Sequence, residues 1–88
     1  MSARAVDGHR DPRLDPWPGD VLQAPRGIDG FVTFHVVAID HITQEVVYLE
    51  NNRGTALRHE LDAWRVDAAG DTVLVRAGVP VDRAEVAR

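Results

Sequence analysis

Hydrophobic and polar positions of this chain alternate in short blocks, the pattern of β-strands rather than of long helices. The clearest block is Phe31–Ile39 (FVTFHVVAI), which is rich in β-branched and aromatic residues and too short for a typical buried helix. Glu45–Glu50 (EVVYLE) and Thr72–Arg76 (TVLVR) have the same character. Val21–Ala24 is a shorter candidate strand that Pro25 is expected to end, because proline lacks the N–H that a sheet ladder needs.

A tight turn at Asn51–Gly54 (NNRG) is expected after the predicted strand Glu45–Glu50, because Asn and Gly tolerate positive φ. The chain should then return as an antiparallel strand over Thr55–His59, with Leu57 pointing inward. Leu57, Leu61 and Trp64 are spaced as on one face of a helix. We predict a strand to His59, then one or two helical turns that carry Leu61 and Trp64 inward. A helix that begins at Thr55 is the alternative.

The two ends of the chain lack such patterns. Residues 1–10 have no periodicity and are expected to form a mobile tail, and residues 77–88 to be loosely held. Residues 11–20 (DPRLDPWPGD) carry three prolines, which favour an extended or polyproline-like course. That segment should close in a turn at Pro18–Asp20, with Trp17 anchoring it. The predicted domain is therefore residues 11–76.

This order of elements predicts an all-β fold with a minor helical turn. With about five short antiparallel strands, curling into a small SH3-like β-barrel removes exposed sheet edges. A helical turn between the fourth and fifth strands is common in such barrels. This likeness rests on the order of the elements, so it concerns the fold only.

Composition limits the class of protein. The chain has 88 residues, no Cys and a formal charge of −4, and all ten of its basic residues are Arg. The missing cysteines favour a cytoplasmic location, and no signal peptide or membrane span is visible. Arg without Lys, beside much Ala and Val, is typical of a GC-rich bacterial genome. The negative balance disfavours nucleic acid as a partner.

The sequence predicts no catalytic, metal or cofactor site. The only serine is Ser2, and both Cys and Lys are absent, which removes the usual nucleophiles. The histidines have no zinc-ligand spacing, although His35 and His59 could meet across strands. Gly27 and Gly30 fit neither glycine-rich phosphate-binding pattern.

Binding is the better expectation, through aromatic side chains or a local basic patch on one edge. The alternative for the aromatic residues is a place in the core or in a lid, and for the arginines surface ion pairs. The candidate binding residues are Trp17, Tyr48, Arg53, Arg58, Trp64 and Arg65.

Two segments together resemble a known group. DPRLDPWPGDV at residues 11–21 and LDAWR at residues 61–65 resemble small uncharacterised bacterial and phage-associated proteins. In that group a DPR-x-DP-x-PGD-V opening precedes a short β-domain that ends in L-x-x-[FW]-R. The resemblance covers residues 11–76 and implies the fold and a bacterial origin, but no activity.

Two functional hypotheses follow. The first is a small non-catalytic interaction or accessory module, of phage or mobile-element derivation, whose partner is another protein. The second is a nucleic-acid-associated SH3-like domain.

Overall fold

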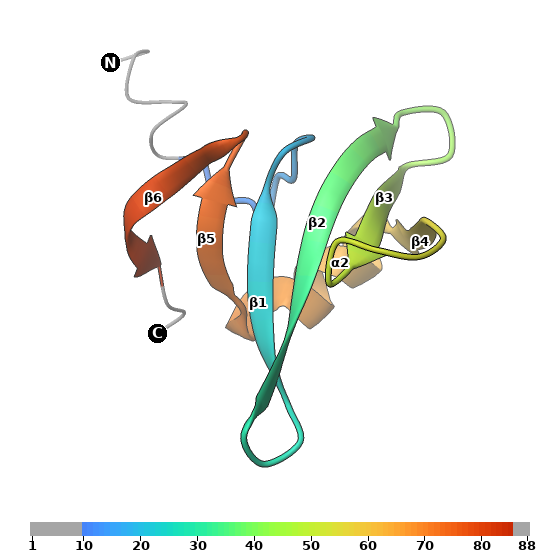
Figure 1. Ribbon diagram of the computed structural model, residues 1–88. Coiled ribbons are helices and arrows are strands. Elements are labelled where there is room, and N and C mark those ends of the chain that lie inside the picture. The colour runs from blue at the N-terminus through green and yellow to red at the C-terminus, as the bar shows by residue number, and fades with distance from the viewer. Residues whose placement is uncertain (1–9, 86–88) are drawn as a thin grey trace.

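The computed structural model describes residues 10–85, with side chains as far as Val81. One antiparallel sheet, with a short helix behind it, makes up the fold (Figure 1). The strands are β1 (Val21–Arg26), β2 (Gly30–Asp40), β3 (Glu45–Glu50), β4 (Leu57–Glu60), β5 (Thr72–Arg76) and β6 (Val79–Glu85). Helix α2 (Leu61–Asp67) continues into the 3-10 turn η1 (Ala68–Gly70).

The strands lie side by side in the order β4-β3-β2-β1-β5-β6. Every neighbouring pair is antiparallel, so the all-β prediction is confirmed. Among the described residues, the end strands β4 and β6 do not pair with each other. The sheet is therefore open, and the closed barrel of about five strands is not what the structure shows.

The two strongest strand predictions are confirmed, since β2 and β3 are neighbours in the sheet. Ile39 lies opposite Val46, and Val36 lies opposite Tyr48. A register shift between Val36 and Ala38 accommodates the extra length of β2.

Strand β6 was not predicted from the sequence, where residues 77–88 were expected to be loosely held. Arg76 pairs with Val79 across a two-residue turn in which both Ala77 and Gly78 have positive φ. Such a turn normally carries Asn or Gly at both positions, so the turn could not be predicted with Ala at position 77. Pro80 also argued against a strand, but an edge strand tolerates proline. Residues 86–88 lie outside the described residues.

Strand β1 also runs two residues further than predicted, through Pro25 to Arg26. Strand β2 pairs with the whole length of β1, whereas β5 pairs only with residues Val21–Gln23 of β1. Pro25 therefore has a sheet neighbour on one side only, which is a position that proline tolerates.

The core lies between the sheet and α2, which covers one of its faces (Figure 1). Its fully or nearly buried members are Leu22, Val36, Val46, Trp64, Ala68 and Val73. The predicted helical turns are confirmed, and they carry Trp64 inward to 4% exposure. Leu57 was expected to point inward but is 41% exposed, because β4 is a short strand at the sheet edge. Neither helical segment in residues 10–85 is long and apolar enough to cross a membrane.

Candidate functional site

The segment before β1 begins with a compact turn, so the extended course predicted for residues 11–20 is wrong for residues 11–15. The backbone N–H groups of Leu14 and Asp15 both donate to the carbonyl oxygen of Asp11, at 2.9 and 2.8 Å. The Asp11 carboxylate accepts the backbone N–H of Arg13 at 3.0 Å, as Asp side chains do at turns. The predicted turn at Pro18–Asp20 is present, and Gly19 has a φ of +91° there.

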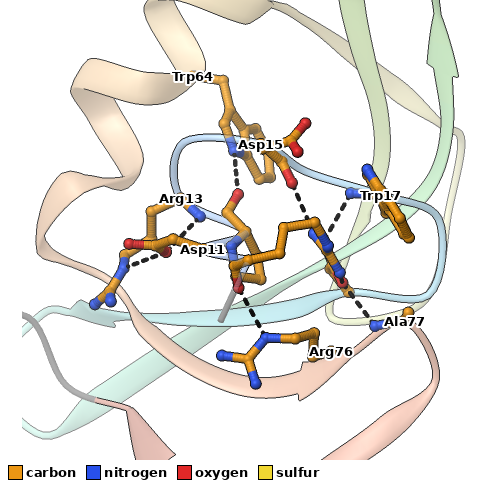
Figure 2. Close-up of polar contacts among 10 residues, drawn as sticks. Asp11, Arg13, Asp15, Trp17, Trp64, Arg76 and Ala77 are labelled. Carbon is orange, nitrogen blue, oxygen red and sulfur yellow. Dashed lines mark hydrogen bonds and ion pairs between the residues drawn. The ribbon is translucent and has the colours of Figure 1, made fainter. Parts of the chain in front are cut away.

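A buried ion pair anchors this segment. The Arg10 guanidinium makes two hydrogen bonds of 2.7 Å with the Asp20 carboxylate, and the two side chains are 4% and 0% exposed. Asp20 also accepts the backbone N–H groups of Trp17 and Ala77, each at 2.7 Å. Arg76 donates to the carbonyl oxygen of Arg10 at 2.9 Å (Figure 2). Residues 10–20 are thus fastened to the β5–β6 turn.

Arg10 is therefore not part of a mobile tail, although the prediction placed it in one together with residues 1–9. Residues 1–9 lie outside the described residues. No local pattern marks Arg10, because its partner Asp20 is ten positions away and the second attachment point, Ala77, is in the β5–β6 turn.

The two segments that carry the family resemblance touch each other. The indole N–H of Trp64 donates to the carbonyl oxygen of Pro12 at 3.1 Å, as Figure 2 shows. Arg65 donates from Nε to the carbonyl oxygen of Leu14 at 2.8 Å. Trp64 and Arg65, both predicted as candidate binding residues, thus hold the N-terminal segment against α2.

Trp17 is 42% exposed and lies apart from the other predicted aromatic residues. The Arg10 guanidinium stacks 4.4 Å from the centre of its ring. The exposed part of Trp17 borders an open groove of about 530 Å³. The groove is lined by Asp15, Pro16, Trp17, Pro18, Val37, Ala38, Ile39, His41, Gln44 and Leu61.

The arginines of the predicted basic patch are largely paired with carboxylates. Arg58 donates to Asp40 at 3.1 Å and to Glu45 at 3.0 Å. The backbone N–H of Thr43, and after it the Arg58 side chain, lower the pKa of Asp40 to about 2.

Arg65 forms a further ion pair with Asp62 at 3.0 Å. Arg53 forms no ion pair within residues 10–85. Its backbone N–H donates to the carbonyl oxygen of Glu50 in the turn after β3.

Four rings gather on the core face of the sheet, beside α2. The ring of Tyr48 lies 5.7 Å from that of Phe34 and 5.6 Å from that of Trp64, between centroids. His59 lies 6.5 Å from Trp64. Strand register explains the grouping. The side chain of Tyr48 in β3 lies on the core face, and the pairing of β2, β3 and β4 places the side chain of His59 in β4 on the same face.

These rings border a hollow of about 270 Å³, which we call the aromatic hollow. It joins Tyr48 and Trp64, two of the predicted binding residues, to residues that the sequence analysis did not select. Its lining is Ala24, Phe34, Tyr48, Glu50, His59, Trp64, Asp67, Ala68 and Asp71. Three of these residues are acidic, and none is Arg.

Asp71 is the unusual member of the aromatic hollow. The residue is only 6% exposed, and its backbone groups are bonded, the N–H to Ala68 and the carbonyl oxygen to Arg13. Its carboxylate, however, accepts no hydrogen bond and forms no ion pair with any described residue. Burial raises the pKa of Asp71 to about 6, against the opposing charge of Arg13 and with a further contribution from Asp67. In the sequence, Gly70-Asp71 carries only the signal of a turn.

The other two carboxylates of the aromatic hollow have partners. Asp67 lies 2.7 Å from Nε2 of His59, and Glu50 lies 3.7 Å from a guanidinium nitrogen of Arg26. The unpaired charge in the hollow is therefore that of Asp71.

The histidines do not assemble into a metal site in the part of the chain that the structure describes, where no group of three possible ligands occurs. His35 pairs with Leu49 and His59 pairs with Val46. Positions 46 and 49 of β3 point to opposite faces of the sheet. His35 and His59 therefore do not meet, contrary to the possibility that the sequence left open.

Searches against family models, curated proteins and solved structures find no match for this chain.

Proposed function

We propose that this chain is a small, non-catalytic protein-interaction module and that the aromatic hollow is its ligand site. The observation that carries the proposal is the partly desolvated Asp71 carboxylate, which has no partner among the described residues and lines the same hollow as the aromatic rings. Buried polar groups are normally hydrogen-bonded, so an unpaired one at a hollow is typical of a place that a ligand completes. The lack of Cys and Lys, and of any serine beyond Ser2, supports a non-catalytic role.

An SH3-like relationship is part of the proposal. The order β4-β3-β2-β1-β5, with helical turns between β4 and β5, supports it, and β6 then extends the sheet beyond β5. The resemblance of residues 11–21 and 61–65 supports an accessory role in a GC-rich bacterium, in the cytoplasm and of phage or mobile-element derivation.

The competing function is nucleic-acid binding by an SH3-like domain. The ion pairs of Arg58 and Arg65 weigh against it, as do the acidic residues of the aromatic hollow. Phosphate binding needs basic side chains that are available to replace counterions. Salt-dependent binding of DNA or RNA would identify this function.

The test is selection of peptides from a random displayed library on the purified chain, followed by mapping of bound peptides by NMR. We expect selected peptides to shift the amide signals of Tyr48, His59 and Asp71. The Tyr48→Leu variant should bind these peptides with an affinity lower by about tenfold or more. Asp29→Asn, in the exposed β1–β2 turn, is the matched control and should leave binding unchanged within about twofold.

Three results would overturn the proposal. Peptides could map only to the groove beside Trp17, or the chain could chemically alter its ligand. It could also bind DNA or RNA with an affinity that falls by about a hundredfold or more between roughly 50 and 200 mM salt, the mark of phosphate recognition.

A further inference from the structure

We infer that the aromatic hollow accepts a positively charged side chain of the partner polypeptide, arginine in the first place, with the Asp71 carboxylate as its counter-ion. This inference rests on the proposed function, because it names the chemistry of the ligand at the same site.

The first argument is the state of Asp71. Asp71 is 6% exposed as a whole residue, and no residue within 10–85 bonds its carboxylate. Partial desolvation of a charge without a partner is unfavourable. The charge of its neighbour Arg13 offsets this only in part, because the Arg13 guanidinium donates its hydrogen bonds to the backbone carbonyl of Asp71 and to the Asp11 carboxylate. A cation that enters the hollow would supply the missing partner.

The second argument is the chemistry of the walls. Tyr48, Phe34 and Trp64 contribute aromatic rings to the lining of the space, and the electron-rich faces of such rings attract cations. A neutral apolar ligand would find the same rings, but it would leave Asp71 buried against hydrocarbon. The combination of rings and an unpaired carboxylate therefore favours a cationic ligand over a neutral one.

The third argument is size. The hollow, at about 270 Å³, lies below the range of about 300–1,000 Å³ that small-molecule pockets usually have. It suits one side chain delivered by a polypeptide. Arginine fits best, because its planar guanidinium can pair with a carboxylate by two hydrogen bonds and also stack on an aromatic ring.

The experiment is an NMR titration of the full chain at pH 7 with N-acetyl-arginine amide, and in parallel with N-acetyl-citrulline amide, its neutral isostere. The indole N–H signals of the two tryptophans are the readout. Trp64 lines the hollow and should shift saturably, with a dissociation constant on the order of 1 mM for so small a ligand. Trp17 borders the other groove and should not move, which makes it an internal control.

Charge recognition is then tested by variants. Citrulline should bind about tenfold more weakly than arginine, and Asp71→Asn should abolish that difference. Tyr48→Leu should weaken both ligands, because it removes a ring and leaves the carboxylate. Asp29→Asn removes the same charge outside the hollow and should change neither affinity by more than about twofold.

Equal binding of arginine and citrulline, or an Asp71→Asn variant that still prefers arginine, would overturn the inference. The failure of the proposed function looks different. If neutral peptides bind at the hollow while the arginine amide does not, the interaction module stands and the cation inference falls. If the arginine amide binds there and no polypeptide does, the cation site stands and the interaction module falls.

Discussion

The indole nitrogen of Trp64 and the backbone carbonyl oxygen of Pro12 are joined by a buried hydrogen bond of 3.1 Å across 52 positions of sequence. The same indole ring packs against Tyr48 and lines the aromatic hollow. One side chain thus fastens the N-terminal segment and forms part of the candidate site, so the position of the segment and the shape of the hollow are coupled.

Replacement of Trp64 should therefore act on stability first. Trp64→Ala is expected to lower the free energy of unfolding by about 3–5 kcal/mol, as for other buried large aromatic residues. That is close to the whole stability of a small domain, so urea or thermal denaturation should show a largely unfolded chain. Trp64→Phe keeps most of the packing and loses the bond to Pro12, for a cost of about 1–2 kcal/mol. A Trp64→Ala chain that melts normally and loses only its ligand would make Trp64 a recognition residue alone.

The Arg10–Asp20 pair gives a second prediction. Arg10→Ala leaves the Asp20 carboxylate buried without its cation, which should lower the free energy of unfolding by about 3–5 kcal/mol. Arg53→Ala is the matched control, because Arg53 is exposed in the turn after β3, and it should cost less than about 0.5 kcal/mol. The measurement is the midpoint of chemical denaturation of the two variants. Equal midpoints would mean that Arg10 belongs to a loose tail, as the sequence alone suggested.

Asp71→Asn should stabilise the fold at pH 7, although it removes the carboxylate that we expect to bind the ligand. Its pKa is about 6 in the folded chain and 3.8 in the reference state, so the folded chain holds the extra proton between these values. Its contribution to stability therefore falls as the pH rises from about 4 to about 6 and stays low above that range. Asp71→Asn should raise the free energy of unfolding at pH 7 by on the order of 1 kcal/mol, a figure reduced for partial solvent screening.

The measurement is the difference in unfolding free energy between Asp71→Asn and the original chain at several pH values. The difference should be small at pH 4, grow toward pH 6 and then level off. Arg13, Asp67, His59, Glu50 and Tyr48 surround or line the same space and are common to both chains, so the comparison isolates the change at position 71. A variant that is less stable at pH 7 would show that Asp71 has a stabilising partner in the fold.

Gly19 and Gly27 provide a matched pair of backbone tests. Both have positive φ, +91° and +70°, but a Cβ on Gly19 would lie 2.8 Å from the backbone nitrogen of Gly78, whereas nothing lies within 4 Å of one on Gly27. Gly27→Ala should cost about 1 kcal/mol from its φ alone. Gly19→Ala should cost more than about 2 kcal/mol, because the backbone of the β5–β6 turn must move as well. Similar melting temperatures for the two variants would contradict the close contact between residues 19 and 78.

The sequence by itself determined the strands whose signal is local. Phe31–Ile39, Glu45–Glu50 and Thr72–Arg76 are β-branched runs bounded by turn residues, and the structure has strands at all three. The spacing of Leu57, Leu61 and Trp64 likewise indicated helical turns, and Leu61 and Trp64 do lie in the short helix, whereas Leu57 lies in β4. Such periodicities are properties of neighbouring residues, so they can be read without knowledge of the rest of the fold.

The tertiary structure alone decided the anchor and the candidate site. Arg10 acquires its role from Asp20 and the β5–β6 turn, and Asp71 acquires its unpaired, desolvated carboxylate from walls supplied by β1, β2, β3, β4 and α2. No short-range pattern encodes either environment, because each depends on strand register and on how α2 crosses the sheet. A charged residue in a turn or near a chain end is usually solvated. Whether it is instead buried depends on distant segments of the chain, which only the folded arrangement brings together.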